Sequence, residues 1–211
     1  DEVIALLDRH IIMDDVTLER DDAADFAVAW PGPLAGAGIE ALETIHPGPG
    51  VLVFGAPEAV AAAVAGAEEV APEGWDARRI EAGAPAWGRE IAAGVFPPEV
   101  GFVAAVSYDK GCFMGQEPLA RIHARGQVNR VLVRVRGGTC PKEPVDLAAP
   151  ERPQAGRWTT WAADGSGAIG LAIVHRSAAA PGTVLTGEAV GAVEVTSGPL
   201  GDDPGLAGKR S

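Results

Sequence analysis

The chain has 211 residues and a mass of 21.5 kDa, and 47% of its residues are hydrophobic while 22% are charged. This balance is typical of a globular protein and excludes the disordered class, whose chains are poorer in apolar residues. The 29 acidic residues outnumber the 17 Lys and Arg residues, so the net charge is −12. We therefore expect no direct nucleic-acid binding, which needs a basic surface, and the short apolar runs predict no membrane insertion.

Two cysteines, Cys112 and Cys140, occur in the sequence. They are too few for a disulfide scaffold, and neither stands in a spacing typical of metal ligands, so we predict no metal site. Reduced thiols and the lack of an export signal in the first residues favour a cytoplasmic protein.

The first third of the chain mixes helical and strand patterns. Residues 3–13 have the spacing of a short helix, and 16–20 alternate as a strand does. Residues 26–30 predict a second strand, which the Pro-Gly-Pro at 31–33 stops. Residues 38–45 predict a helix.

The middle of the chain leads into a loop-rich region. We predict a buried strand over 51–54, a helix over 57–66 that begins at Pro57 and ends at a left-handed Gly66, and a strand over 75–81. Glycines and prolines from 83 to 98 predict irregular backbone that could line a pocket.

A short helix through Arg125, ended by Gly126, precedes a change of pattern. From residue 127 the valines at 131, 133 and 135 alternate with polar residues, and further short strands follow. The fold class that we predict is α+β over 1–126, followed by an all-β barrel or sandwich over 127–211 with a loose tail.

The stretch 107–118 has the strongest chemical character. Cys112 lies shortly before the predicted helix and two residues after Lys110, and both a helix N-terminus and a cation stabilise a thiolate. A reactive thiol is therefore one interpretation. The alternative is a small buried side chain packed by Phe113 and Met114.

Basic residues concentrate in one part of this acidic chain. Between residues 109 and 136, six basic residues face two acidic ones, which gives a local charge of +4. Glu117, Arg121 and Arg125 share one face of the predicted helix, and an exposed ladder of ion pairs would also explain them. A local basic pocket favours a small anionic ligand with carboxylates or phosphates.

Aromatic and acidic side chains surround the loop-rich region. Trp75, Trp87, Glu81 and Glu99 could supply a stacking surface and carboxylates that accept paired N–H bonds, which together indicate a heterocycle pocket. The alternative is that the tryptophans are core residues and the glutamates are solvated.

Several of these segments together resemble a known family. Residues 110–117 read Lys-Gly-Cys-Phe-Met-Gly-Gln-Glu, and 79–83 read Arg-Ile-Glu-Ala-Gly. With the segment 126–132, they resemble the YgfZ-type folate-binding proteins, which are relatives of the glycine-cleavage T-protein, an aminomethyltransferase. The likeness continues into residues 167–176 and 181–183, which resemble the C-terminal barrel of that family.

The resemblance implies a protein that binds tetrahydrofolate, or a one-carbon-substituted folate, and supports iron–sulfur cluster assembly or repair in client enzymes, including tRNA-modifying ones. It implies folate contacts from Glu81, Trp75 and Arg130, and a thiol role for Cys112 beside Lys110. Trp87, Glu99, Gln116 and Glu117 complete the set of residues that we predict to bind the cofactor.

Members of the resembled family begin with roughly a further third of chain, so we expect that the folate-binding core here is a fragment. Two other functions stay open. One is an aminomethyltransferase-like enzyme that transfers one-carbon units to folate, for which the sequence offers Glu81 or Glu99 as a base but no matched aspartate. The other is a protein-interaction module that docks a client on the barrel.

Overall fold

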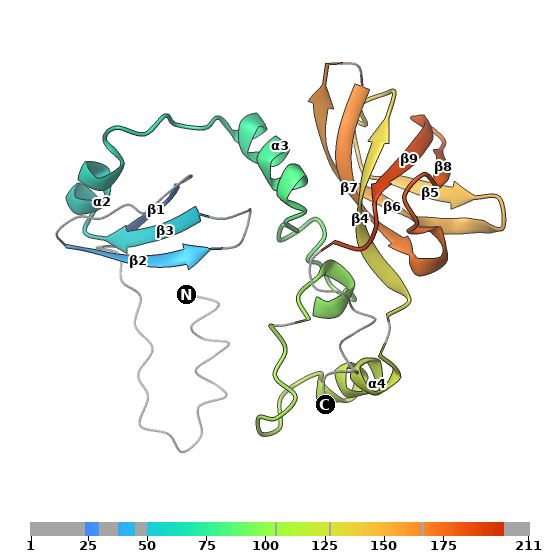
Figure 1. Cartoon of the computed structure of the whole chain (residues 1–211), viewed down its shortest axis with the longest axis horizontal. Coiled ribbons are helices and arrows are strands. Elements are labelled where there is room, and N and C mark those ends of the chain that lie inside the picture. Colours follow the sequence, from blue (N-terminus) through green and yellow to red (C-terminus); the bar gives the residue numbers. More distant parts are fainter. Residues whose placement is uncertain are drawn as a thin grey trace. The chain divides into compact units, whose positions relative to one another are not determined.

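The computed structural model describes residues 24–29, 38–44, 50–103, 105–126, 128–165 and 167–200 (Figure 1). Contacts within the chain divide it into two compact units, with the boundary next to residue 70. From the sequence we predicted a folate-binding core over 1–126 and a barrel domain over 127–211. This division into domains stays a prediction. The predicted helix at 3–13 and strand at 16–20 lie outside the described residues.

The first unit contains a three-stranded antiparallel sheet in the order β1-β3-β2. Its elements are β1 (Asp25–Ala29), β2 (Ile39–Thr44), β3 (Gly50–Gly55) and the helix α2 (Pro57–Val64). Val51 and Val53 of β3 and Val60 of α2 form its small buried core. The strands predicted at 26–30 and 51–54 and the helix begun by Pro57 are confirmed, but Gly66 does not adopt the left-handed conformation.

The helix predicted over 38–45 is wrong, because these residues form β2. Ala41 of β2 lies opposite Val53 in the antiparallel ladder with β3. Leu, Glu and Ala are good helix formers, but this preference amounts to a few tenths of a kcal/mol per residue. The hydrogen bonds and side-chain packing that β2 gains by pairing with the buried strand β3 outweigh this helix preference.

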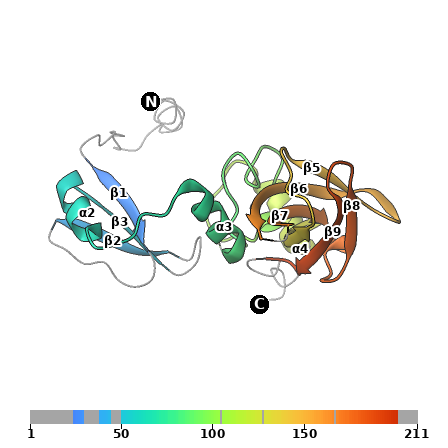
Figure 2. The same ribbon diagram turned by 90° about the horizontal axis from the view of Figure 1, so that it is seen from above.

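The second unit is built on a closed six-stranded barrel, which Figure 2 shows from above. The strands follow the ring order β4-β7-β6-β5-β8-β9, and every neighbouring pair is antiparallel. Their bounds are β4 (Arg130–Gly137), β5 (Val145–Ala149), β6 (Arg152–Asp164), β7 (Gly167–His175), β8 (Val184–Gly187) and β9 (Gly191–Ser197). The all-β region predicted from its alternation is therefore a barrel.

Alternation along β4 separates the inside of the barrel from its outer face. Val131, Val133 and Val135 are buried inside with Trp158, which is fully buried. Leu132 on the opposite face is also buried, because α3 (Pro72–Ala82) and the short helix η1 (Pro97–Val100) cover the outside of the barrel there. A second apolar layer, separate from the barrel interior, thus fixes α3 on the barrel.

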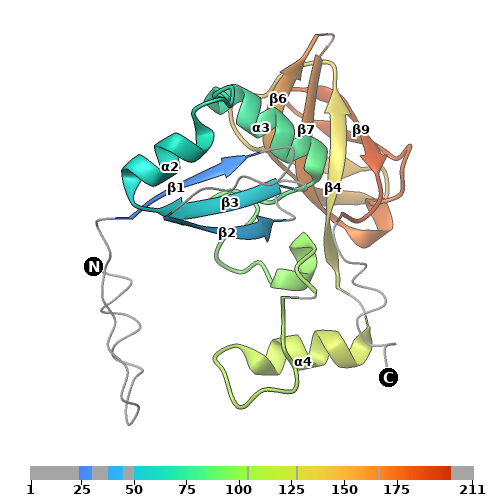
Figure 3. The same ribbon diagram turned by 60° about the vertical axis from the view of Figure 1, so that its left-hand side comes forward.

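The strand predicted over 75–81 is wrong, because this segment lies within α3. Figure 3 shows α3 beside β6 and β7, with which it makes its contacts. Asp76, Arg79, Ile80 and Gly83 follow the i, i+3, i+4, i+7 spacing of one helix face, and Arg79 and Ile80 are buried. Pro72 at the start and a left-handed Gly83 after the end provide the boundary signals.

A buried polar cluster joins α3 to the barrel. The Arg79 guanidinium is 3% exposed and donates to Glu90 Oε2 at 3.0 Å and to Thr160 Oγ1 at 3.0 Å. Glu90 is fully buried, and its other oxygen accepts hydrogen bonds from the hydroxyls of Thr159 and Thr160. The register between β6 and β7 shifts here, and such a bulge lets two consecutive hydroxyls reach one carboxylate.

The helix α4 (Gln116–Arg125) confirms the prediction of a helix that ends at Gly126, whose φ of 67° is left-handed. Leu119 is its buried anchor. Among the helices of the described residues, none has both the length and the apolar character required to cross a membrane.

We expect Glu90→Gln to lower the free energy of unfolding by about 3 kcal/mol, because it removes the buried counter-charge of Arg79 and leaves that cation only the partly exposed Asp76, at 3.3 Å. Urea denaturation followed by fluorescence would measure this. The matched control is Asp146→Asn, which removes an exposed ion pair with Arg157 and should cost less than about 1 kcal/mol. Equal losses in the two variants would contradict a central role for the cluster.

Gly170 of β7 is expected to tolerate no side chain. A Cβ placed there would lie 1.9 Å from Nε1 of Trp158 and 2.2 Å from the Thr160 carbonyl oxygen. Gly170→Ala should therefore destabilise the barrel by at least about 3 kcal/mol, as overpacking against fixed backbone does. Gly138→Ala, where a Cβ meets nothing within 4 Å, is the control and should leave the thermal midpoint nearly unchanged.

Candidate functional site

Residues 110–115 form a mostly exposed loop that leads into α4, and Gln116 and Glu117 are the first two residues of that helix. Cys112 is exposed, so the alternative in which it is a packed core residue is wrong. The Lys110 ammonium lies over the Phe113 ring, 4.7 Å from its centre. Gln116 accepts a hydrogen bond from the Phe113 amide at 3.1 Å, which orders the loop next to the thiol. Glu117 pairs with Arg121 on the surface of α4.

An aromatic pair attaches this loop to α4. The rings of Tyr108 and His123 stack with their centres 4.0 Å apart. Burial raises the pKa of the Tyr108 hydroxyl, so the phenol stays protonated at neutral pH. Its oxygen and Nδ1 of His123 are both buried without a hydrogen-bond partner among the described residues. The pair holds the segment that carries Cys112 through ring contact alone.

Glu99 and Arg130, both predicted to bind the cofactor, lie together and contact each other. The Arg130 guanidinium donates to both Glu99 oxygens, at 2.9 and 2.8 Å, and also to the Gly94 carbonyl at 2.7 Å. Glu99 is buried and accepts a further hydrogen bond from the Phe96 amide. The hydrogen bond with Glu99 raises the pKa of Arg130, while partial burial of the guanidinium acts to lower it.

A groove of about 230 Å³ lies between η1 and α4. Its lining includes the apolar side chains of Phe96, Pro118 and Ile122 and the cations Arg121 and Arg125. Glu99 lines it as well, with its charge balanced by Arg130. The groove can accommodate a ligand with an apolar body and a carboxylate.

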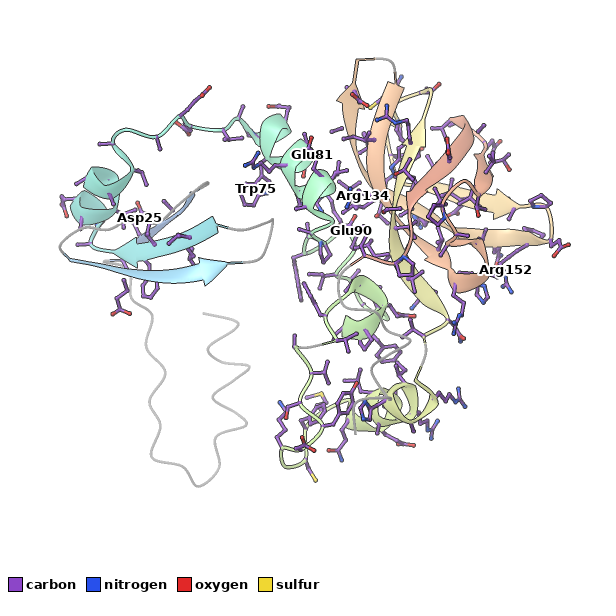
Figure 4. All side chains as sticks on the ribbon, in the orientation of Figure 1. Asp25, Trp75, Glu81, Glu90, Arg134 and Arg152 are labelled. Carbon is purple, nitrogen blue, oxygen red and sulfur yellow. The ribbon has the colours of Figure 1, made fainter. Side chains whose placement is uncertain are left out.

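A second cleft, of about 260 Å³, lies where the end of α3 meets the outer face of β4. It is lined by Glu81 of α3 and by Arg134 and Arg136 of β4, together with Asp164 and Thr196. Figure 4 marks Glu81 and Arg134 on these two elements. Of the residues predicted to bind the cofactor, Glu81 alone lines this cleft.

The basic residues between 109 and 136 differ in whether they have partners. Four are engaged, because Lys110 lies over Phe113 and three arginines form ion pairs: Arg121 with Glu117, Arg130 with Glu99, and Arg136 with Asp164. Within the described part of the chain, the side chains of Arg125 and Arg134 have no hydrogen-bond or ion-pair partner. Each lines one of the two clefts. Sequence reasoning counted Arg134 as one of six cations and did not single it out.

The tryptophans lie apart from the two clefts. Trp75 is 36% exposed on α3, six residues before Glu81, which places the two side chains about 120° apart around the helix. Trp87 is 86% exposed in the turn that follows α3. The structure thus brings Glu99 and Arg130 together, sets Glu81 beside Arg134, and leaves Trp75 and Trp87 on other surfaces. No cluster of His, Cys, Asp and Glu in the described residues could hold a metal ion.

The arrangement of a mixed α/β part and a closed barrel matches a solved structure. The glycine cleavage system aminomethyltransferase T from Bartonella henselae superimposes with a TM-score of 0.60 over 76% of this chain, at 20% sequence identity. The fold is that of the T-protein. The match covers 49% of the Bartonella chain, so this sequence spans about half of that protein.

A curated protein is also similar in sequence. A chloroplastic protein of Arabidopsis thaliana, described as a putative transferase, is 30% identical over 122 residues, which are 56% of this chain and 28% of the plant protein. No family model matches the chain.

Proposed function

We propose that this chain is part of a tetrahydrofolate-binding accessory protein that supports iron–sulfur cluster assembly or repair in client enzymes, including tRNA-modifying ones. The observation that carries the proposal is the Glu81 carboxylate, which lines a cleft on a T-protein fold and has no partner among the described residues. Folate ring systems present adjacent N–H groups, and a free carboxylate accepts such a pair.

The residues of the cleft fit one end of such a ligand. Pockets for small molecules usually hold about 300–1,000 Å³, so a cleft of about 260 Å³ suits one ring system and not a whole folate. A carboxylate acceptor and a guanidinium donor lie in the same cleft, which matches a heterocycle with both donors and acceptors at its edge. Tetrahydrofolate, when bound, would supply a carrier for one-carbon units.

The Cys112 thiol is the group that we propose acts on the iron–sulfur client enzymes. Cys112 is exposed in the loop before α4, where a client protein can reach it. The exposed Met114, two residues away, extends the same surface. In this proposal, the loop that carries Cys112 contacts the iron–sulfur client enzymes. The folate binds elsewhere, in the cleft between α3 and β4.

A second candidate is folate-dependent one-carbon transfer of the aminomethyltransferase type. It is favoured by the names of the two similar proteins, one an aminomethyltransferase and the other a putative transferase. It requires a base near the folate, and Glu81 is the carboxylate available in the cleft. Folate-dependent transfer of formaldehyde from a small amine by the full-length protein would establish it over the accessory role.

We expect tetrahydrofolate to bind the full-length protein under anaerobic conditions with micromolar affinity, and Glu81→Gln to weaken it about 10-fold to 100-fold, the value of a hydrogen bond to a charged group. Isothermal titration calorimetry would measure both. The matched control is Glu188→Gln, an exposed glutamate in the turn between β8 and β9. An intact wild-type protein that binds no folate would refute the proposal.

The thiol is tested in cells. Cys112→Ser should lower the activity of iron–sulfur enzymes while folate affinity in vitro stays unchanged, because the thiol lies outside the cleft. Cys140→Ser, which replaces the other exposed free thiol, is the control and should have no effect. Full enzyme activity with Cys112→Ser would show that the thiol has no part in the function.

A further inference from the structure

The cleft beside Glu81 contains a second charged group without a partner. Arg134 lies on the outer face of β4, and its Nε is buried without a hydrogen-bond partner among the described residues. A buried donor left unsatisfied costs about 1–3 kcal/mol, and most such groups in native proteins are paired. A bound ligand with a hydrogen-bond acceptor would therefore satisfy the Arg134 guanidinium.

The neighbouring charges do not supply that acceptor. Asp164 lines the same cleft, but it pairs with Arg136. Glu81 also lines the cleft, and no ion pair joins it to Arg134. Among the described residues, the cleft thus has one carboxylate and one guanidinium without a partner, contributed by α3 and β4, and no ion pair joins them.

The two charged groups determine which hydrogen-bonding groups a ligand must present on the side that faces them. Glu81 requires N–H donors, whereas Arg134 requires an acceptor such as a carbonyl oxygen. A 2-amino-4-oxopyrimidine ring, as in a pterin, carries an amino group and a ring N–H next to its carbonyl. A ligand with donors alone would leave Arg134 unsatisfied, and a simple carboxylate would meet repulsion from Glu81.

We propose that Arg134 is a ligand-binding residue that donates hydrogen bonds to the 4-oxo group of a pterin whose amino and ring N–H groups are held by Glu81. This inference rests on the proposed folate-binding function and adds the residue that sets specificity for the 4-oxo form. The guanidinium suits this task because several of its N–H groups lie in one plane and two can share one acceptor region.

The test compares two ligands on the same full-length protein. Tetrahydrofolate and its 4-amino analogue at the same reduction level differ in the 4-substituent that Arg134 is proposed to contact and in the adjacent ring N–H that faces Glu81, so the Arg134 variant is needed to separate the two contributions. Wild-type protein should bind the 4-oxo ligand at least about 10-fold more tightly, since the analogue presents a donor to a donor. Equal affinity for the two ligands would overturn the inference and leave folate binding by Glu81 intact.

Three variants locate the effect. Arg134→Met should weaken tetrahydrofolate binding about 10-fold to 100-fold and reduce the discrimination between the two ligands by at least about 10-fold, with the thermal midpoint unchanged or raised. Arg136→Met removes a cation of the same cleft that is already paired, and Arg152→Met removes an exposed cation on the barrel (Figure 4); both should keep the discrimination. Discrimination that is unchanged in Arg134→Met, or that Arg136→Met reduces equally, would contradict the inference.

Failure of the two proposals gives different results. If wild-type protein binds neither ligand, both the folate function and the role of Arg134 are wrong. If it binds both ligands with equal affinity and Glu81→Gln weakens both, the folate function stands and only the role of Arg134 is rejected.

Discussion

The buried ion pair between Arg79 and Glu90 is the interaction on which the position of the candidate site depends. Arg79 belongs to α3, and Glu90 takes hydrogen bonds from two threonines of β6, so the pair ties the helix to the barrel from within. Buried ion pairs contribute little net stability compared with apolar packing, but removing one partner is costly, so they fix geometry strictly. Because α3 is held in this way, Glu81 at its end lines the same cleft as Arg134 of β4.

The distribution of charge also separates the two units. Residues 1–69 contain 14 acidic and two basic residues and carry the whole net charge of −12, whereas residues 70–211 contain 15 of each and are neutral. Ligand choice in the barrel unit therefore depends on local pairing and not on net charge. Of the six bases between 109 and 136, three form ion pairs and Lys110 lies over Phe113. The two without a partner among the described residues, Arg125 and Arg134, each line one of the two clefts.

Prediction from sequence succeeded where a local pattern had one physical meaning. The alternation along 131–135 predicted a barrel strand because only one face could be apolar, and Gly126 predicted the end of α4. It failed where the local pattern was ambiguous. The segment 38–45 has helix-forming residues but pairs with β3, and α3 was misread because its buried face includes Asp76 and Arg79, charged residues that an apolar period does not count. The partners of these arginines become visible only after folding.

The sequence by itself determined the barrel strands, the helix that ends at Gly126, the 110–117 motif and the presence of a basic cluster in an acidic chain. It also named Glu81, Glu99 and Arg130 as candidates through a resemblance. The tertiary structure alone decided that Glu99 and Arg130 bind each other across 31 residues, and that Glu81 shares a cleft with Arg134. The physical reason is that charges far apart in the chain acquire partners only when the barrel closes and α3 packs on it, and no local pattern encodes those distances.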